Sequence, residues 1–116
     1  MLTLKNQWNF NMLNLTEDNL EKIIAESNKP VFVDMYADWC GPCKMIAPLV
    51  EELSKEYGDK VEFISVDVDA NAVSTATYGV RSIPTLLVFN RGELMKRHSG
   101  AIPKNKIVEL FQNYIV

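Results

Sequence analysis

Trp39-Cys40-Gly41-Pro42-Cys43 contains both cysteines of this 116-residue chain. Two cysteines three positions apart lie on one face of the first turn of a helix. Their Cα atoms are then less than about 7 Å apart, which is close enough for a disulfide. The exposed N–H groups and the positive dipole end of such a turn favour a thiolate at Cys40. Pro42 suits the first turn, because its missing N–H would have no intrahelical partner there. The stretch is therefore predicted to open a helix and to cycle between a dithiol and a disulfide.

Two other interpretations of the cysteine pair are weaker. A purely structural disulfide across so short a loop removes only about 2 kcal/mol of unfolded-chain entropy, and the 47% hydrophobic composition already supplies a core. A zinc site needs about four ligands, whereas the chain offers two cysteines and the single His98. We therefore expect redox chemistry at this pair, with no metal and no cofactor.

The length and composition predict one domain that has no surface for binding nucleic acid or a membrane. A length of 116 residues suits a single domain that buries a core. The net charge of −3, with both signs interspersed, argues against nucleic-acid binding and against a polybasic membrane contact. In addition, no apolar stretch approaches the roughly 20 residues of a membrane span.

The first fourteen residues bear on the cellular compartment. They are too polar to form the core of a signal peptide, and they contain no arginine of the kind that transit peptides carry. We therefore expect a cytoplasmic protein. A periplasmic location is the alternative, if a leader has been removed.

Hydrophobic periodicity and turn residues predict the order of helices and strands. Val31–Tyr36 is a nearly continuous apolar run, typical of a strand buried on both faces of a sheet. The helix that opens at the cysteines extends to about Tyr57, and Gly58 ends it. The other expected elements are a helix over roughly 17–27 capped by Thr16, a strand over 61–68, a helix over 71–78, a hairpin of strands 85–89 and 94–98, and a helix over about 104–114.

This order of elements predicts an α/β protein whose mixed central β-sheet is flanked by helices on both faces. Residues 1–13 are expected to form an N-terminal extension, and residues 14–116 are expected to form the folded domain.

Over about residues 14–116 the chain resembles the thioredoxin family. Trp39-Cys40-Gly41-Pro42-Cys43-Lys44 matches the active-site signature of that family. The resemblance continues without gaps through Asp34, Pro48, Gly79-Val80-Arg81, Ile83-Pro84-Thr85, Gly92 and Gly100. It implies the thioredoxin fold. The Gly-Pro between the cysteines resembles the reductase type, because disulfide isomerases and strong oxidants usually carry a histidine in that dipeptide.

The resemblance implies a role for each cysteine in a protein-disulfide reductase. Cys40, exposed at the helix start, would attack a disulfide in a client protein and form a mixed disulfide with it. Cys43, one turn further along and less exposed, would then attack Cys40 and release the reduced client. Exchange of this kind needs a thiolate, and it is fastest when the thiol pKa lies near the ambient pH.

Asp34 is the third candidate catalytic residue. It stands in the apolar run Val31–Tyr36, where an isolated carboxylate would be costly to bury. By pattern alone it could equally lie at the exposed end of the strand and accept backbone hydrogen bonds. The resemblance implies instead a buried aspartate below the cysteines, which takes the proton of the resolving thiol.

The resemblance also implies a client-binding surface around the cysteines. It comprises Trp39, Gly41, Pro42, Ile83, Pro84, Gly100 and Ala101. In the family the peptide bond that corresponds to Ile83–Pro84 is cis and lies against the disulfide. The backbone of Ile83 would pair with the client chain, and Pro84 would keep metal ions off the thiols. The alternative is a proline that only marks the start of a strand.

Three positions depart from the commonest pattern of the family. Ser65 stands where a lysine usually partners the buried aspartate, Ser82 replaces a glycine, and Tyr36 replaces a tryptophan. None of them removes a group that disulfide exchange requires, although Ser82 could narrow the client groove. Because burial raises the pKa of a carboxyl group and Ser65 brings no opposing positive charge, we expect a raised pKa for Asp34.

The expected partners are disulfide-containing client proteins and, as electron donor, a thioredoxin reductase, which is an NADPH-dependent flavoprotein. The chain itself is expected to be a monomer. A non-redox clamp is a second possible function, which would use the surface around Trp39, Ile83, Gly100 and Ala101 but would not need the cysteines. A dedicated extracytoplasmic reductant or oxidant is a third, with the same site in another compartment. The intact cysteine pair favours the reductase.

Overall fold

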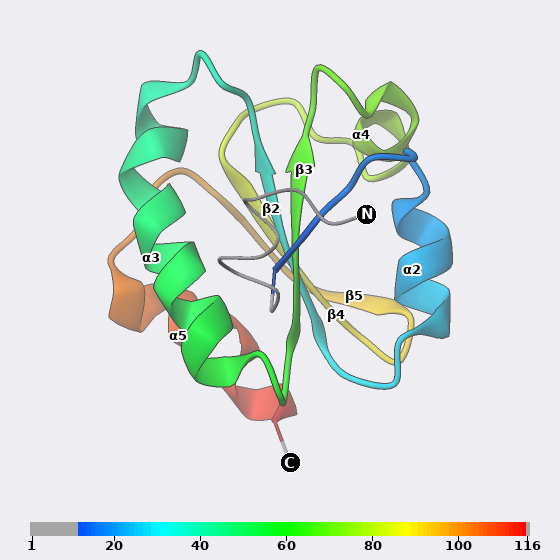
Figure 1. Cartoon of the computed structure of the whole chain (residues 1–116), viewed down its shortest axis with the longest axis vertical. Coiled ribbons are helices and arrows are strands. Elements are labelled where there is room, and N and C mark those ends of the chain that lie inside the picture. Colours follow the sequence, from blue (N-terminus) through cyan, green and yellow to red (C-terminus); the bar gives the residue numbers. More distant parts are fainter. Residues whose placement is uncertain (1–11, 116) are drawn as a thin grey trace.

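A five-stranded mixed sheet forms the centre of the protein (Figure 1). The computed structural model describes residues 12–115. The strands are β1 (Met12–Asn14), β2 (Val31–Tyr36), β3 (Glu62–Asp67), β4 (Thr85–Asn90) and β5 (Glu93–Ser99), and their order across the sheet is β1-β3-β2-β4-β5. β1 and β2 run parallel to β3, whereas β4 runs antiparallel to β2 and β5. The predicted α/β fold with a mixed sheet is confirmed.

Helices cover both faces of this sheet (Figure 1). The helices α3 (Gly41–Tyr57) and α5 (Lys104–Phe111) lie on one face, and α2 (Leu20–Glu26) and α4 (Ala72–Thr77) lie on the other. The 3₁₀ turn η1 (Gln112–Tyr114) follows α5. Each face of the sheet contributes to its own cluster of buried hydrophobic side chains.

The central strand β2 is buried on both faces, and its side chains alternate between the two clusters. Val31, Val33 and Met35 belong to the cluster beneath α2, whereas Phe32 belongs to the cluster beneath α3 and α5. Because successive side chains of a strand point to opposite faces, Asp34 shares the face of Phe32. A carboxyl group therefore lies between the sheet and the helix that begins at the cysteines.

The predicted bounds of β2 and the predicted end of α3 are confirmed, and those of β3, α4, β4 and β5 are correct to within one residue. The last helix is α-helical only to Phe111 and continues as η1. Gly58 follows α3 as expected. Its φ of −61° shows that the helix ends without the left-handed conformation that glycine permits.

The largest difference from prediction lies at the start of the described chain. Met12 and Leu13, which we had placed in an N-terminal extension, belong to the edge strand β1, and residues 1–11 lie outside the described residues. The predicted cap Thr16 is also wrong, because α2 begins only at Leu20, after Asn19. The backbone N–H of Leu15 donates to the carbonyl of Ser65, so the chain still follows the sheet where the helix was expected to begin.

None of the helices within residues 12–115 combines the length and the hydrophobicity that crossing a membrane requires.

Candidate active site

The two cysteines lie where the chain leaves β2 and begins α3. Cys40 is the N-cap of this helix, and its Sγ accepts a hydrogen bond of 3.2 Å from the backbone N–H of Cys43. Pro42 lies in the first turn, as its lack of an N–H favours. The cysteines form a disulfide with 5.3 Å between their Cα atoms. The local sequence thus builds the redox-active turn that its spacing predicts.

Both cysteines are more buried than expected. Cys40 was predicted to be exposed, but its exposed fraction is 5%, close to the 3% of Cys43. The disulfide packs against Ala37, with Ile83 at the edge of the same cluster. The carbonyl oxygen of Ile83 lies 3.7 Å from Cys40 Sγ. The segment that contains Ile83 is far from Cys40 in sequence, yet it helps to cover this cysteine. The local pattern around Cys40 does not predict this cover.

Trp39 presents a broad apolar surface beside the disulfide. Its exposed fraction is 70%, and its indole Nε1 donates a hydrogen bond of 2.8 Å to Asp69 Oδ2. Asp69 is held in turn, because its backbone N–H donates to Asp67 Oδ1. Asp69 was missed in the sequence, since a single aspartate thirty residues away in a turn carries no distinctive pattern.

The segment around Pro84 brings a second part of the expected client surface to the cysteines. The Ile83–Pro84 peptide bond is cis. The carbonyl of Pro84 accepts a hydrogen bond of 2.9 Å from the backbone N–H of Gly100. Gly100 has a φ of 104°, a conformation that side-chain-bearing residues rarely adopt. Ala101 follows it at an exposed position. Ile83 thus contacts Cys40 directly, whereas Gly100 is linked to this segment by its hydrogen bond to Pro84.

Asp34 is buried, which excludes the alternative of an aspartate at an exposed strand end. Its exposed fraction is 4%, and its Oδ1 has no hydrogen-bond partner among residues 12–115. Burial raises the pKa of this carboxyl group to about 7, because an apolar environment disfavours the charged form. The group can therefore take up or release a proton near neutral pH.

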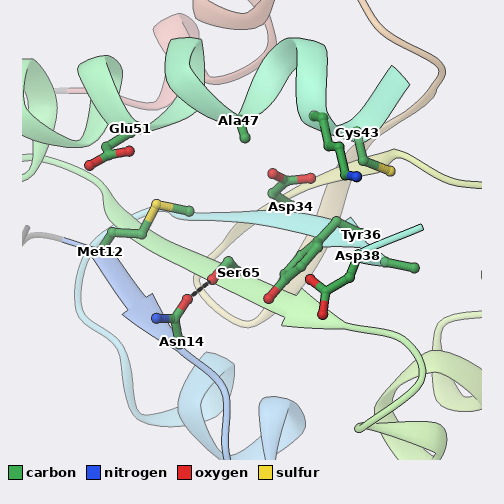
Figure 2. Close-up of a pocket in the computed structure, with 11 residues that line it drawn as sticks. Met12, Asn14, Asp34, Tyr36, Asp38, Cys43, Ala47, Glu51 and Ser65 are labelled. Carbon is green, nitrogen blue, oxygen red and sulfur yellow. Dashed lines mark hydrogen bonds between the residues drawn. The ribbon is translucent and has the colours of Figure 1, made fainter. Parts of the chain in front are cut away.

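A cavity of about 250 Å³ connects Asp34 with Cys43 on the α3 side of the sheet (Figure 2). Strands β1, β2 and β3 form its floor, and α3 forms its roof. Asp34 points from the floor toward α3, and Cys43 and Glu51 lie on that helix at different ends of the view. Asp34 and Cys43 therefore line one common space.

Ser65 and Tyr36, two of the positions that depart from the family pattern, also line this cavity. Ser65 pairs in register with Asp34, but its hydroxyl donates to the side-chain oxygen of Asn14 on β1 (Figure 2). Partial burial raises the pKa of Tyr36, and nearby Asp67, Asp38 and Asp34 raise it further. No positive charge from β1 or β3 reaches Asp34 within the described residues, since both contribute only uncharged side chains to the cavity. Ser82, the third such position, is exposed in the loop before Ile83.

Comparisons with known proteins agree with this geometry. The family model described as Thioredoxin matches residues 11–113. A thioredoxin of Haemophilus influenzae is 38% identical over 104 residues, which cover 90% of this chain and 97% of that protein. A thioredoxin of Rickettsia prowazekii is 41% identical over 83% of this chain and 91% of its own length. An M-type chloroplastic thioredoxin of Chlamydomonas reinhardtii is 40% identical, covering 87% and 72% of the two chains.

Proposed function

The chain belongs to the thioredoxin family and is a dithiol–disulfide oxidoreductase, and from this premise we propose the roles of its individual site residues. In the reduced protein the Cys40 thiolate attacks one sulfur of a client disulfide. The new Cys40–client bond forms as the client's S–S bond breaks, and the other client sulfur leaves as a thiolate.

Cys43 completes the exchange. Its thiolate attacks Cys40 Sγ, which forms the Cys40–Cys43 disulfide and expels the second client thiolate. Two electrons have then passed to the client, which takes up two protons, and this chain is oxidised. The single observation that supports this order is the hydrogen bond from the Cys43 N–H to Cys40 Sγ, because it stabilises negative charge on Cys40.

Asp34 is proposed to accept the proton of Cys43 before the second attack. Three observations support this role: both side chains line one cavity, Asp34 Oδ1 has no protein partner within residues 12–115, and the pKa of the carboxyl group is about 7. A base with a pKa near the working pH is efficient, because it is substantially ionised and still holds the proton it accepts.

Client proteins are proposed to dock over the surface formed by Trp39, Gly41, Pro42, Ile83, Pro84, Gly100 and Ala101. The exposure of Trp39 supports this proposal, since aromatic side chains are preferred anchors in protein interfaces. Ile83 would offer its backbone to the extended client chain, within reach of the attacking sulfur.

We further propose that the protein works as a monomer in the cytoplasm and is rereduced by an NADPH-dependent flavoprotein of the thioredoxin-reductase type. The domain is inferred to begin with β1 at Met12, and residues 1–11 precede it. Turnover with NADPH and a purified thioredoxin reductase, compared with dithiothreitol as reductant, tests the electron donor.

Trapping tests the assignment of the two cysteines. The Cys43→Ser variant should accumulate a mixed disulfide with reducible insulin, whereas the Cys40→Ser variant should not. The opposite pattern would reverse the roles. In the Cys40→Ser/Cys43→Ser double variant, insulin reduction should be lost. If the double variant still bound its partner proteins and replaced the wild-type protein in cells, the protein would act as a non-redox clamp instead.

A further inference from the structure

The cavity beneath the disulfide has the size and the lining of a small-ligand site. Its volume of about 250 Å³ lies just below the range of about 300–1,000 Å³ that is usual for pockets that take drug-sized ligands. Carboxyl groups come from Asp34, Asp38 and Glu51, while Met12 and Ala47 supply apolar walls. Such a lining suits a small molecule with one positive group and a short apolar chain.

One wall of the cavity carries a buried carboxyl oxygen without a hydrogen-bond partner among residues 12–115. Asp34 Oδ1 is buried and has no hydrogen-bond partner among the described residues, and the carboxyl group points toward α3 (Figure 2). Buried polar atoms in native proteins almost always have a partner. Ser65 pairs in register with Asp34 but donates its hydroxyl hydrogen to Asn14, so this hydroxyl does not donate to Asp34.

The charges around the cavity favour a cation. Lys44 is the single basic side chain among the described residues that line it, and it forms no ion pair within residues 12–115. The carboxyl groups of Asp38 and Glu51, joined by Asp34 when it is ionised, thus outnumber this one ammonium group. An inorganic ion fits less well, because no group of three or more metal-ligating side chains comes together in the described part of the chain.

We propose that this cavity binds a short primary alkylammonium ion. Its ammonium group pairs with the Asp34 carboxylate, and its alkyl chain lies against Met12 and Ala47. The shape of the ligand follows from the lining: a charged donor at the acidic floor and an apolar tail toward the methionine and the alanine. The existence of this site does not depend on a proton-transfer role of Asp34.

Ligand binding should be coupled to the ionisation of Asp34. The groups that can titrate around the cavity are Asp34, Tyr36 and Asp38 on the β2 side, and Lys44, Glu51 and, when reduced, Cys43 on α3. A cation beside Asp34 favours its ionised form and lowers its pKa. If Asp34 accepts the Cys43 proton as proposed above, the bound ion would extend disulfide reduction to lower pH. That consequence alone rests on the proposed function.

Titration of the oxidised full-length protein with n-butylammonium chloride, followed by carboxyl-carbon NMR at constant ionic strength, tests the site. We expect a saturable shift of the Asp34 signal, and tighter binding above the Asp34 pKa of about 7 than below it. Neutral n-butanol should bind at least about tenfold more weakly, since hydrogen bonds to charged groups are the stronger ones. No saturable shift, or equal binding of n-butanol, would overturn the proposal.

Variants locate the bound ion. Ala47→Leu fills the cavity from an exposed helix position and should abolish binding without unfolding the protein. Asp34→Asn should weaken binding at least about tenfold through loss of the charge. Glu51→Gln should weaken it measurably, whereas the matched control Glu52→Gln should not, because Glu52 contacts Lys104 and does not line the cavity. Unchanged binding in both Ala47→Leu and Asp34→Asn would place the ion elsewhere and refute the site.

Discussion

Asp18 and Asp34 show how two regions of one small protein use the same side chain in opposite ways. At the start of α4, the Asp18 carboxylate accepts backbone N–H hydrogen bonds of 2.9 Å from Val73 and 2.8 Å from Ser74. Burial opposes ionisation there, but these hydrogen bonds and one from the Ser74 side chain outweigh it and lower the pKa of Asp18. Beneath the disulfide, burial acts on Asp34 unopposed and raises its pKa.

The difference shows which of the two aspartates is available for proton transfer. Asp18 remains ionised and accepts hydrogen bonds from the first N–H groups of α4. These bonds link the segment before α2 to a helix 55 positions further along the chain. Asp34 has an oxygen without a partner among residues 12–115, a cavity beside it and a pKa of about 7. A carboxyl group that is left unsatisfied costs stability, but it can exchange a proton at the pH where disulfides are reduced.

The largest expected effect is on disulfide exchange. Asp34→Asn should slow insulin reduction by about a hundredfold, the lower end of what general acid–base groups contribute. Asp18→Asn should leave the rate unchanged, because Asp18 lies at the start of α4 and does not line the cavity of Cys43. Steady-state rates of both variants at neutral pH make the comparison. An equal loss in both would remove the distinction between the two regions.

The second effect is on the pH dependence of stability. The folded-state pKa of Asp34, about 7, lies above the unfolded value of 3.8, so its burial costs stability progressively as the pH rises between these values. Asp34→Asn should raise the free energy of unfolding above that window by on the order of 4 kcal/mol, the equivalent of about three pKa units.

Asp18 should show the opposite sign. Its pKa is lowered on folding, so its stabilisation is present above the unfolded value of 3.8 and is lost as the pH falls below it. Asp18→Ala should therefore lower the melting temperature at neutral pH and have less effect in acid. Urea unfolding of the wild type, Asp34→Asn and Asp18→Ala across pH measures both signs, and parallel pH profiles would contradict the account.

A smaller effect is expected from placing a positive charge in the cavity. Ser65→Lys should lower the pKa of Asp34 by about one unit or more, because an opposite charge nearby favours the carboxylate. The pH profile of insulin reduction should move downward by a similar amount. Ser65→Met adds bulk without charge and is the matched control. If both variants shift the profile equally, then the cause is packing rather than charge.

The smallest effect concerns Trp39, the exposed residue that precedes Cys40. Its indole is held by Asp69 next to the cysteines, and a disulfide quenches nearby tryptophan fluorescence, so emission should rise on reduction. The measurement belongs in a Trp8→Phe background, because the chain has two tryptophans. Asp69→Ala should reduce the change by freeing the ring. A spectrum that does not respond to reduction would mean that Trp39 does not face the disulfide.

The sequence predicts best the parts that local patterns determine. The apolar run of β2 and the cysteine turn at the start of α3 specify their own conformations, and the structure places both as predicted. The edge strand β1 was missed, because three residues carry too little periodicity to be distinguished from an extension. The start of α2 was misplaced, and the hydrogen bond from Leu15 to the distant Ser65, which keeps the chain along the sheet before α2, cannot be seen in the local sequence.

The candidate active site also has parts that the sequence predicts and parts that it does not. The redox pair and the buried Asp34 follow from the motif, the apolar run and the family resemblance. The cover that Ile83 provides over Cys40 and the hydrogen bond from Trp39 to Asp69 join residues 43 and 30 positions apart. The cavity depends on Met12 and Asn14 in the missed strand and on the direction of the Ser65 hydroxyl. Such features arise from tertiary packing and leave no local pattern.

Carboxyl-carbon NMR titration of the oxidised wild-type protein tests the central claim most directly, because it reads Asp34 and Asp18 in one experiment. The account predicts that Asp34 titrates with a pKa near 7 and Asp18 below its ordinary value of 3.8. An Asp34 pKa at or below 3.8 would contradict the claim that this carboxyl group is buried beneath the disulfide and that no partner from the described part of the chain favours its ionised form.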